Sequence, residues 1–600
     1  MKKLVSYQMT DYLERRGIKH VFGLCGHTVI GFLDALKQSK MNYISVRHEQ
    51  IAAHAADGYA RATKKASVLL THLGPGLTNA ATGVANAALD SVPMVVIAGD
   101  IPSYYYGKHP HQEVNMHGDA TQMDIYKPFV KRAWRVDRPE AMPEILDKAF
   151  RLAESGRPGP VLVSVPMDIF SKEIDTSYFE RTFKDSHFTV KPDLPKETAA
   201  KIAKKLIEAE NPVIHIGGQL IYTEASEELA ELIEFLDIPV TRSLMGQGVI
   251  PDTHPLHVGM TGFWGTDFVN SFSANADVLL GVGTRFAEAD SSSWYDGITF
   301  DSNNTEFMQI DLDPVEIGRN FPVSIGAVAD PKKALKSILE EAKKIKPEGI
   351  DKQDVKDKIK NYKKEFKESN KEISEDTRYP MTPQKILKDV REVFPEDGII
   401  VTDVGWNKNG VGQQFDITQP GTIMHPGGLA TMGFGPAAIL GAKLAAPDKK
   451  VITLVGDGGF GTNPSVMATA VEQNIPVVWV IMNNSAFGTI AGLESAHYEH
   501  SFGTLFKKKN GEKYNPEWSE IAKAYGVNSK KIMKAEEFKE AFKEALEANE
   551  PYLLDVPMEN IPVPTDGIWN INDIYTPKDN VIEGKFLGGK VVKSEHKATE

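Results

Sequence analysis

Residues 451–484 read VITLVGDGGFGTNPSVMATAVEQNIPVVWVIMNN. An apolar run precedes the tripeptide GDG, a helix-compatible segment follows it, and a second apolar run, 475–482, leads into a pair of asparagines. Apolar runs of this length joined by a helical segment predict a strand, a tight turn, a helix and a second, parallel strand. Asp457 and Asn484 then lie beyond the carboxyl ends of the two strands, the edge at which open α/β sheets bind ligands.

The residue types at this edge suit a metal ion and a diphosphate. A carboxylate oxygen of Asp457 and an amide oxygen of Asn484, held near glycine N–H groups, match a hard divalent cation that bridges phosphate groups. Mg²⁺ usually takes few protein ligands and fills its coordination shell with phosphate oxygens and water. A bare GDG is also an ordinary turn signal, so this interpretation needs support from the rest of the chain.

The composition describes a globular protein and excludes several other classes. The chain has 600 residues, of which 41% are hydrophobic and 25% are charged, so about three or four domains are expected. A net charge of -13 without a dense basic stripe argues against a nucleic-acid partner. A single cysteine, Cys25, excludes an internal disulfide framework and fits a reducing compartment. No secretory signal and no membrane-spanning segment is apparent, so we expect a cytoplasmic enzyme that does not bind a membrane.

Short apolar runs, each predicted to be a strand, alternate with helical patterns along most of the chain. They are HVFGLCG, YISVRHE, ASVLLTHLGPG, PMVVIAGD and GPVLVSVP in the first part, PVIHIGG, IPVTRS, ADVLLGVGTRF and EFMQIDLDP in the middle, and GIIVTDVG, KVITLVGDG, PVVWVIMNN and YLLDVP in the last. Repeated βα units of this kind predict an α/β protein with doubly wound parallel sheets. The pattern lapses twice, in a polar connector and in a stretch dominated by Lys, Glu and Asp. We therefore predict three successive α/β domains at 1–185, 190–346 and 379–560, with a charged helical linker at 347–378 and an irregular tail at 561–600.

Several motifs together resemble the thiamine diphosphate enzyme family. The GDG segment with its asparagine pair is one of them, and a second is Glu49 before the helix QIAAHAADGYARA. A glycine-rich turn, HLGPGLTN, lies at 72–79, and GLATMGFG lies at 428–435. The resemblance covers nearly the whole chain to about residue 564 and is greatest to acetolactate synthases. It implies an N-terminal pyrimidine-binding domain, a middle domain and a C-terminal diphosphate-binding domain.

The resemblance also implies a role for each matching residue. Glu49 would hydrogen-bond the pyrimidine ring of the cofactor, Met432 would force the cofactor into its bent shape, and the carbonyl of Ala430 would accept from the aminopyrimidine. Asp457, Asn484 and the carbonyl of Ala486 would ligate Mg²⁺. The remaining cofactor contacts are expected from Gly405, Asn407, Gly456, Gly458, Gly459 and Phe487. In this family the active sites form between subunits, which implies a homodimer or homotetramer.

The middle domain resembles the version of the family that carries FAD as a structural group. Gly217-Gly218, 259–262 and 311–313 support this resemblance. Acetolactate synthases usually continue Arg-Phe as R-F-D-D-R, whereas this chain reads Arg285-Phe286 followed by AEA. The missing second arginine puts a site for two carboxylate substrates in doubt. The resemblance therefore leaves three outcomes open for the middle domain: FAD, an ADP group, or neither.

Two histidines in the first domain depart from acetolactate synthases. His27 follows Gly26 where those enzymes have Pro-Gly-Gly, and His72 precedes the glycine-rich turn. His72 resembles a histidine of benzoylformate decarboxylase, and the pair resembles cyclohexane-1,2-dione hydrolase. Imidazoles of ordinary pKa suit proton transfer near neutral pH. The less favoured alternative is that each ring is a plain polar group in a strand-end loop. Gln112 falls where the family places a glutamine that faces the thiazolium ring. It is therefore the candidate for a substrate-orienting amide, with His111 as a weaker companion.

We therefore expect Glu49, His27, His72 and Gln112 to be the catalytic residues. The predicted function is a C–C bond lyase or carboligase that decarboxylates a 2-oxo acid and passes the carbanion to a proton or to a carbonyl acceptor. A 1,2-diketone hydrolase is the alternative within the family. A cofactor-binding member without activity is an outside alternative, which the presence of Glu49 disfavours. The sequence does not identify the substrate.

Overall fold

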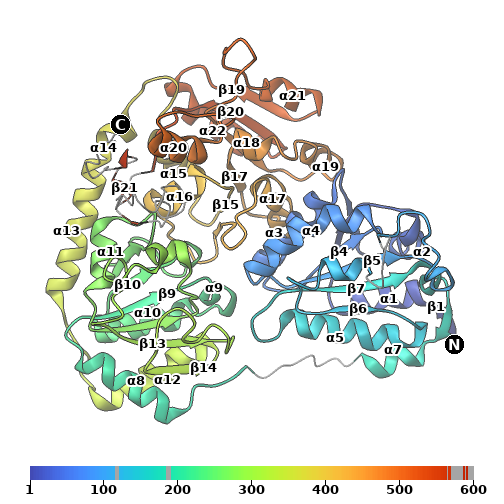
Figure 1. The fold of residues 1–600 in the computed structure, drawn as a ribbon, viewed down its shortest axis with the longest axis horizontal. Helices are drawn as coiled ribbons and strands as arrows, with labels where there is room; N and C mark the ends of the chain where they lie inside the picture. The colour runs from blue at the N-terminus through green and yellow to red at the C-terminus, as the bar shows by residue number, and fades with distance from the viewer. Residues whose placement is uncertain are drawn as a thin grey trace, which may run out of the picture.

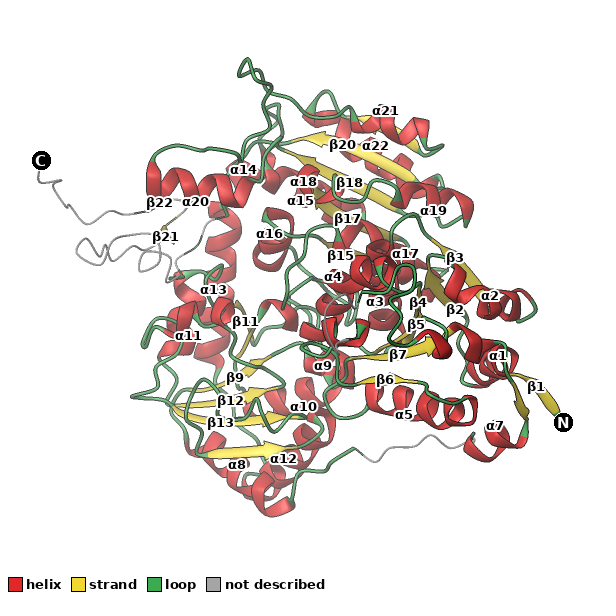
Figure 2. Ribbon diagram, turned by 45° about the vertical axis from the view of Figure 1, so that its right-hand side comes forward, coloured by secondary structure: helices red, strands yellow, loops and turns green. Residues whose placement is uncertain are grey.

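The computed structural model describes residues 1–114, 121–183, 191–563, 565, 567–568, 586–587 and 590–591. The described residues form three parallel sheets of six strands, each flanked by helices (Figures 1 and 2). The α/β class and the three doubly wound parallel sheets are thus confirmed. No helix in these described ranges combines the length and the apolar character needed to cross a bilayer.

The first sheet has the strand order β3-β2-β4-β5-β7-β6. Its strands are β2 (His20–Gly23), β3 (Asn42–Ser45), β4 (Ser67–Thr71), β5 (Met94–Asp100), β6 (Ala133–Arg135) and β7 (Pro160–Pro166). The helices of this region are α1 (Val5–Arg15), α2 (Ile30–Lys37), α3 (Glu49–Thr63), α4 (Pro75–Leu89), α5 (Met142–Glu154), α6 (Met167–Phe170) and α7 (Ser177–Thr182). A separate antiparallel pair joins β1 (Lys2–Leu4) to β8 (Glu173–Asp175).

The middle sheet, green in Figure 1, has the order β11-β10-β9-β12-β13-β14. Its strands are β9 (Pro212–Ile216), β10 (Val240–Arg242), β11 (His257–Met260), β12 (Val278–Val282), β13 (Glu306–Asp311) and β14 (Ile325–Val328). Its helices are α8 (Lys196–Glu208), α9 (Gln219–Thr223), α10 (Ser226–Leu236), α11 (Asp267–Ala274) and α12 (Pro331–Ile345). The residues predicted as a charged linker contain α13 (Gln353–Ser369) and α14 (Lys371–Glu375), which run along the outside of the molecule.

The third sheet has the order β16-β15-β17-β18-β20-β19. Its strands are β15 (Ile399–Thr402), β16 (Ile423–Met424), β17 (Val451–Gly456), β18 (Val478–Asn483), β19 (Asn528–Lys531) and β20 (Tyr552–Pro557). Its helices are α15 (Pro383–Val393), α16 (Trp406–Gln414), α17 (Phe434–Ala445), α18 (Asp457–Phe460), α19 (Val466–Glu472), α20 (Gly488–Tyr498), α21 (Trp518–Ala524) and α22 (Ala535–Glu547). Within the predicted tail, β21 (Phe586–Leu587) pairs with β22 (Lys590–Val591), and most other tail residues lie outside the described ranges.

The first and third sheets share one hydrophobic core. A single cluster of buried side chains contains Phe22 and Leu69 from the first sheet and Val455 and Trp479 from the third. The helices α3 and α17 lie side by side between the two sheets (Figure 1). Both helices are rich in alanine and glycine, so their backbones approach closely. The two sheets thereby form one unit, and the strand ends of each have a defined position relative to the other.

Each sheet reverses its strand order at one point. The reversal lies between β2 and β4 in the first sheet, between β9 and β12 in the middle sheet, and between β15 and β17 in the third. At such a reversal the loops leaving two neighbouring strands diverge to opposite faces, and a crevice opens at the carboxyl edge. Functional sites are therefore expected at these three crevices.

Candidate active site

The GDG turn lies at the crevice of the third sheet. β17 ends at Gly456, α18 begins at Asp457, and the parallel register pairs Gly456 with Met482 of β18. The strand, turn, helix and strand predicted for this segment are thus present, although the helical part is divided between α18 and α19. Asp457, directly after β17, and Asn483, the last residue of β18, consequently lie at neighbouring strand ends.

Asp457 is a buried carboxylate, and only one of its two oxygens accepts a hydrogen bond from a described side chain. Its side chain is 1% exposed, and its Oδ2 accepts a hydrogen bond from Asn515 Nδ2 at 2.6 Å. Its Oδ1 is buried and accepts no hydrogen bond of ordinary geometry from the residues that the structure describes. Burial raises the pKa of Asp457 to about 6, although Asn515 and nearby backbone N–H groups offset part of this effect. A buried carboxylate oxygen without a partner is costly, and a cation is the group that removes this cost.

The asparagine pair divides into two roles. Asn483 accepts from Asn515 at 2.6 Å through its Oδ1, so one asparagine amide bridges Asn483 and Asp457. Asn484 is half-buried, and its Oδ1 accepts from the backbone N–H of Ala486 at 3.2 Å. Asn515 thus joins Asp457, a predicted metal ligand, to Asn483, which directly precedes the predicted ligand Asn484. Sequence reasoning missed Asn515, because it lies in an irregular segment without any motif.

Glycines leave room around the turn for a ligand or for a neighbouring group. A Cβ on Gly458 would lie 2.7 Å from the ring of Phe487, and a Cβ on Gly459 would overlap Asp403 Oδ2. No atom lies within 4 Å of the position of a Cβ on Gly456. Gly405 precedes α16 with φ of 111°, and Asn407 in the first turn donates to the carbonyl of Leu454 at 2.8 Å. The loops after β15 and β17 therefore meet at the crevice, as the strand order requires.

Asp403 holds the loop that contains Met432. Its two carboxylate oxygens accept hydrogen bonds from the backbone N–H groups of Gly433 (3.2 Å) and Gly435 (3.1 Å). Burial raises the pKa of Asp403 to about 6. Ala430 has a positive φ of 53°, and Ala430 and Met432 are both half-buried. Asp403 directly follows β15, so its place at a strand end can be predicted from the sequence. Its hydrogen-bond partners, Gly433 and Gly435, are 30 and 32 residues further along the chain and cannot.

Glu49 lies at the start of α3 in the first part of the chain. Its side chain is 4% exposed, and its Oε2 accepts from Asn79 Nδ2 at 3.0 Å. The N-terminus of a helix stabilises a negative charge, so this position suits a carboxylate. A Cβ on Gly76 would lie 3.3 Å from Glu49 Oε1 and 3.0 Å from the Cβ of His72. Glu49 and His72 therefore flank the same glycine.

The histidines gather at the crevice of the first sheet. His27 follows β2 and His72 follows β4, and these strands are neighbours at the point of reversal. The ring centres of His27 and His72 are 4.6 Å apart in an edge-to-face arrangement, and His111 stacks on His27 at 6.3 Å. Burial lowers the pKa of His27, and His72 and His111 lower it further. The neutral imidazole of His27 therefore persists to a lower pH than that of an ordinary histidine.

Gln112 completes this cluster. Its Oε1 lies 2.8 Å from His72 Nε2, and the other ring nitrogen of His72 lies 2.7 Å from Thr28 Oγ1. His72 is 7% exposed, whereas His27 and Gln112 are exposed. The structure thus brings together three of the four predicted catalytic residues, with Glu49 beside them. The cluster combines a buried imidazole with exposed groups that a substrate can reach.

A network of buried charges connects the first and third domains of the chain. Arg61 of α3 binds Asp57 (2.5 Å) and Asp90 (2.7 Å), and it donates to the carbonyl of His425 at 2.8 Å. The carboxylate of Asp90 also accepts from the backbone N–H groups of Gly427 and Gly428. A first-domain carboxylate therefore holds the third-domain loop that leads into Ala430 and Met432.

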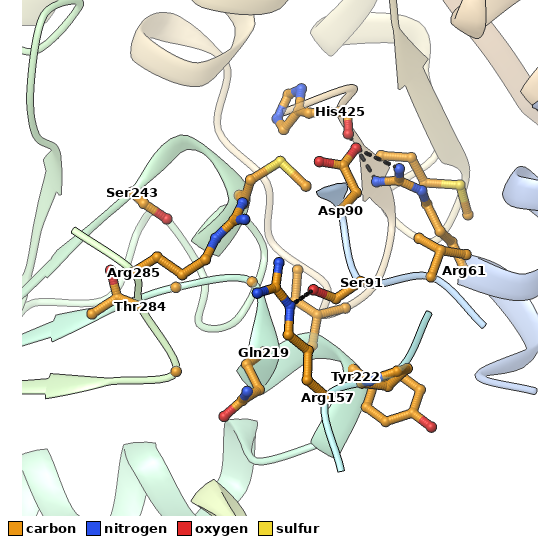
Figure 3. A pocket seen from close by; sticks show the side chains of 18 of the residues that line it. Arg61, Asp90, Ser91, Arg157, Gln219, Tyr222, Ser243, Thr284, Arg285 and His425 are labelled. Carbon is orange, nitrogen blue, oxygen red and sulfur yellow. Dashed lines mark hydrogen bonds and ion pairs between the residues drawn. The ribbon is translucent and has the colours of Figure 1, made fainter. Parts of the chain in front are cut away.

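A third crevice forms where the middle sheet meets the other two (Figure 3). Gly217-Gly218 after β9 and Arg285 after β12 line it, as the strand order predicts. Arg157 reaches in from the first domain, where it donates to Ser91 Oγ at 2.8 Å and pairs with Glu316 at 2.6 Å. Asp311, at the end of β13, accepts from Gln219 at 3.0 Å, and burial raises its pKa to about 6.

Comparison with known proteins identifies the family. Three family models match: the N-terminal thiamine pyrophosphate (TPP) binding domain at residues 4–123, the central domain of thiamine pyrophosphate enzymes at 199–338, and the C-terminal TPP binding domain at 403–556. Thiamine pyrophosphate is another name for thiamine diphosphate. The three matched ranges contain the three crevices described above.

Curated relatives match over almost their whole length. A probable acetolactate synthase large subunit of Methanocaldococcus jannaschii is 37% identical over 566 residues, which is 92% of each chain. A second from Methanococcus aeolicus is 36% identical over 91% of this chain and 90% of its own. The large subunit of acetolactate synthase isozyme 3 of Escherichia coli is 32% identical over 89% of this chain and 90% of its own. The chain therefore belongs to the thiamine diphosphate-dependent enzymes, and within them it is an acetolactate synthase-like enzyme.

Proposed function

We propose that this enzyme is a Mg²⁺- and thiamine diphosphate-dependent carboligase that acts on a 2-oxo acid. The observation that carries the proposal is the bare, buried Oδ1 of Asp457 at the crevice of the third sheet. In a thiamine diphosphate-dependent enzyme, that oxygen would ligate the cation that accompanies the cofactor diphosphate. The acetolactate synthase relatives support a carboligase and do not favour a diketone hydrolase.

The residues at the two crevices fit the cofactor by chemistry. Asp457, Asn484 and the carbonyl of Ala486 would hold Mg²⁺, with oxygen ligands of the type that this ion prefers. The glycine loops around 405 and 456–459, together with Asn407, would face the diphosphate. Glu49, Ala430 and Met432 would bind and bend the rings. Thiamine diphosphate, when bound, supplies a carbon nucleophile and an electron sink for a 2-oxo acid.

The side chains of this protein have separate tasks in such a reaction. The carboxylate of Glu49, buried at the start of α3, would hold a proton at a ring nitrogen of the cofactor. The exposed amide of Gln112 would orient the substrate. His27, whose pKa is lowered, would accept or return a proton near neutral pH. His72, buried between Thr28 and Gln112, would orient the amide.

We infer that the active site forms between two chains of a homodimer or homotetramer. The first-domain cluster carries exposed aromatic side chains nearby, and so does the third-domain half. They are Tyr104, Tyr105 and Tyr106 in the first domain, and Phe487, Tyr498 and Phe502 in the third. Exposed apolar side chains gathered near functional groups are typical of an interaction surface. A second copy of this chain would cover them.

The crevice of the middle sheet would hold a nucleotide. The strand order 3-2-1-4-5-6, counted along the middle domain, is that of dinucleotide-binding folds, and glycine turns line the crevice. The guanidinium groups of Arg157 and Arg285 suit phosphate oxygens. FAD and an ADP group both fit this chemistry. The visible absorbance of the purified protein distinguishes them, since only a flavin absorbs near 450 nm.

A substrate screen tests the proposed reaction. Purified protein is incubated with thiamine diphosphate, Mg²⁺ and single 2-oxo acids, with and without a second 2-oxo acid or an aldehyde, and the products are identified by mass. A carboligase forms a product that contains both carbon skeletons. An aldehyde alone would indicate a simple decarboxylase. Turnover of a 1,2-diketone without any 2-oxo acid activity would overturn the proposal.

A further inference from the structure

Thr28 has a hydroxyl that joins two strand-end loops of the first sheet. It lies in the short helical turn His27–Val29 after β2, and it is 1% exposed. Its Oγ1 accepts from the backbone N–H of Leu73 at 3.4 Å and lies 2.7 Å from His72 Nδ1. The Leu73 N–H occupies one of the two lone pairs of this oxygen, so both the hydroxyl proton and the second lone pair remain available to Nδ1.

The second nitrogen of His72 determines the direction of these hydrogen bonds. Nε2 lies 2.8 Å from Gln112 Oε1. A carbonyl oxygen can only accept, so Nε2 carries the proton and Nδ1 is the unprotonated nitrogen. That assignment agrees with donation from the Thr28 hydroxyl to Nδ1. The hydrogen bonds from Leu73 through Thr28 and His72 to Gln112 therefore all point the same way.

Three glycines fit closely around these side chains. A Cβ on Gly26 would overlap the ring of His72, and a Cβ on Gly99 would overlap Thr28 Oγ1. A Cβ on Gly74 would overlap the backbone oxygen of Gln112. A larger residue at any of the three positions would push one member of the chain of hydrogen bonds out of place. Packing thus holds Thr28, His72 and Gln112 in one arrangement.

We propose that Leu73, Thr28, His72 and Gln112 form a directional hydrogen-bond relay that turns the amide N–H of Gln112 toward the substrate, as donor to a carbonyl oxygen that gains negative charge. Thr28 is the positioning residue of this relay, because its hydroxyl donates to Nδ1 and so supports the tautomer that Gln112 Oε1 requires. Aligned hydrogen bonds polarise one another and strengthen the last donor. Gln112 is exposed and His72 is buried, so the amide is the group that the substrate meets.

The tautomer of His72 can be measured without cofactor or substrate. In ¹⁵N-histidine-labelled protein, protonated and unprotonated ring nitrogens resonate far apart, and a His72→Gln variant assigns the signals. We expect His72 with the proton on Nε2 in the native protein and in Thr28→Ser. In Thr28→Val, which keeps the shape and removes the hydroxyl, the Nδ1 signal should shift. A proton on Nδ1 in the native protein would overturn the relay.

Kinetics test whether Thr28 acts through Gln112. Under saturating thiamine diphosphate and Mg²⁺, Thr28→Val should lower kcat/KM for the 2-oxo acid about 10- to 100-fold, and Thr28→Ser should restore most of it. In a Gln112→Leu background, Thr28→Val should change kcat/KM less than about twofold, because the relay has lost its end. Thr10→Val, which removes another buried hydroxyl of the first domain, should have no effect.

The outcomes separate this relay from the function on which it rests. A native protein without turnover of any 2-oxo acid would reject the proposed function, while the tautomer measurement would still decide the arrangement. Equal losses from Thr28→Val with and without Gln112 would reject the relay alone, and so would a Thr28→Ser variant as impaired as Thr28→Val. The melting temperature of each variant shows whether it has folded.

Discussion

Glu49 is a buried carboxylate whose second oxygen, Oε1, faces the glycine turn of the candidate site. The substitution Glu49→Gln keeps the shape and the hydrogen bond from Asn79, but its amide is neutral and does not titrate. We expect a folded variant whose kcat is at least about 100-fold lower, since a positioned acid–base group contributes that much or more. Steady-state turnover of the best 2-oxo acid measures this loss.

A matched substitution shows whether that loss is specific. Glu472 is exposed and forms an ion pair with Arg47. Glu472→Gln removes one charge without touching the candidate site, and its turnover should equal that of the native protein. If Glu49→Gln retained full activity at saturating cofactor, the role assigned to Glu49 would be wrong.

His215 of β9 makes folding stability depend on pH. It is fully buried between Phe286 and Phe300, and burial lowers its pKa from 6.5 to about 3. As the pH falls, the unfolded chain binds a proton here near pH 6.5 and the folded chain only near pH 3. Stability is therefore complete above pH 6.5 and is lost below it. At pH 5 this single residue costs about 2 kcal/mol.

The substitution His215→Gln removes this titration. We expect the difference between the melting temperatures at pH 7.5 and pH 5 to be smaller in the variant than in the native protein. His500, which is exposed, offers a control, and His500→Gln should leave the difference unchanged. An equal difference in His215→Gln and in the native protein would show that this ring does not carry the pH dependence.

At the scale of elements, α3 and α17 hold the first and third sheets of one chain together. A Cβ on Gly441 of α17 would overlap the carbonyl oxygen of Ala55 in α3. Gly441→Ala should therefore destabilise the protein by about 1–3 kcal/mol, although alanine is the better helix former. Gly492 of α20 has no atom within 4 Å of its Cβ position, so Gly492→Ala should be neutral or stabilising. Thermal unfolding compares the two variants.

Most strands were predictable from local sequence, and the exceptions share a physical cause. The apolar runs correspond to β2, β3, β4, β5 and β7, to β9, β10, β12 and β13, and to β15, β17, β18 and β20. The prediction missed β6, β11, β14, β16 and β19, all of them edge strands of their sheets. β19 reads NSKK and β16 has two residues. An edge strand is buried less and pairs on one side, so its sequence carries a weak signal.

At the scale of the whole molecule, a site formed between subunits makes a prediction about mixtures. If Glu49 of one chain faces Asp457 of another, two inactive variants complement each other. Equal amounts of Glu49→Ala and Asp457→Ala chains, unfolded and reassembled together, should recover about one quarter of native activity, because half of the dimers are mixed and each has one intact site. Turnover of the reassembled mixture measures this recovery.

Each variant reassembled alone is the control and should remain inactive. Native protein treated in the same way gives the reference for complete recovery. A mixture that stays as inactive as its components, while the native control recovers, would place the whole site within one chain. The mass of the native assembly in solution then distinguishes a dimer from a tetramer.

The family and the types of residue at the candidate site were determined by the sequence alone. Asp457, Gly456 and Glu49 belong to short segments in which a strand ends and a helix begins, and such local patterns can be recognised without knowledge of the rest of the fold. The same holds for the GLATMGFG segment, whose glycines flank Met432. Local sequence therefore identified the chemistry that each loop offers.

Tertiary structure alone decided which loops meet. His27 and His72 are 45 positions apart in the sequence, and their rings lie 4.6 Å apart because β2 and β4 are neighbours where the strand order reverses. The bridge from Asn515 to Asp457 and the hydrogen bonds of Asp403 likewise depend on contacts between distant segments. Strand order is set by the packing of whole helices and sheets, and no short stretch of sequence records it.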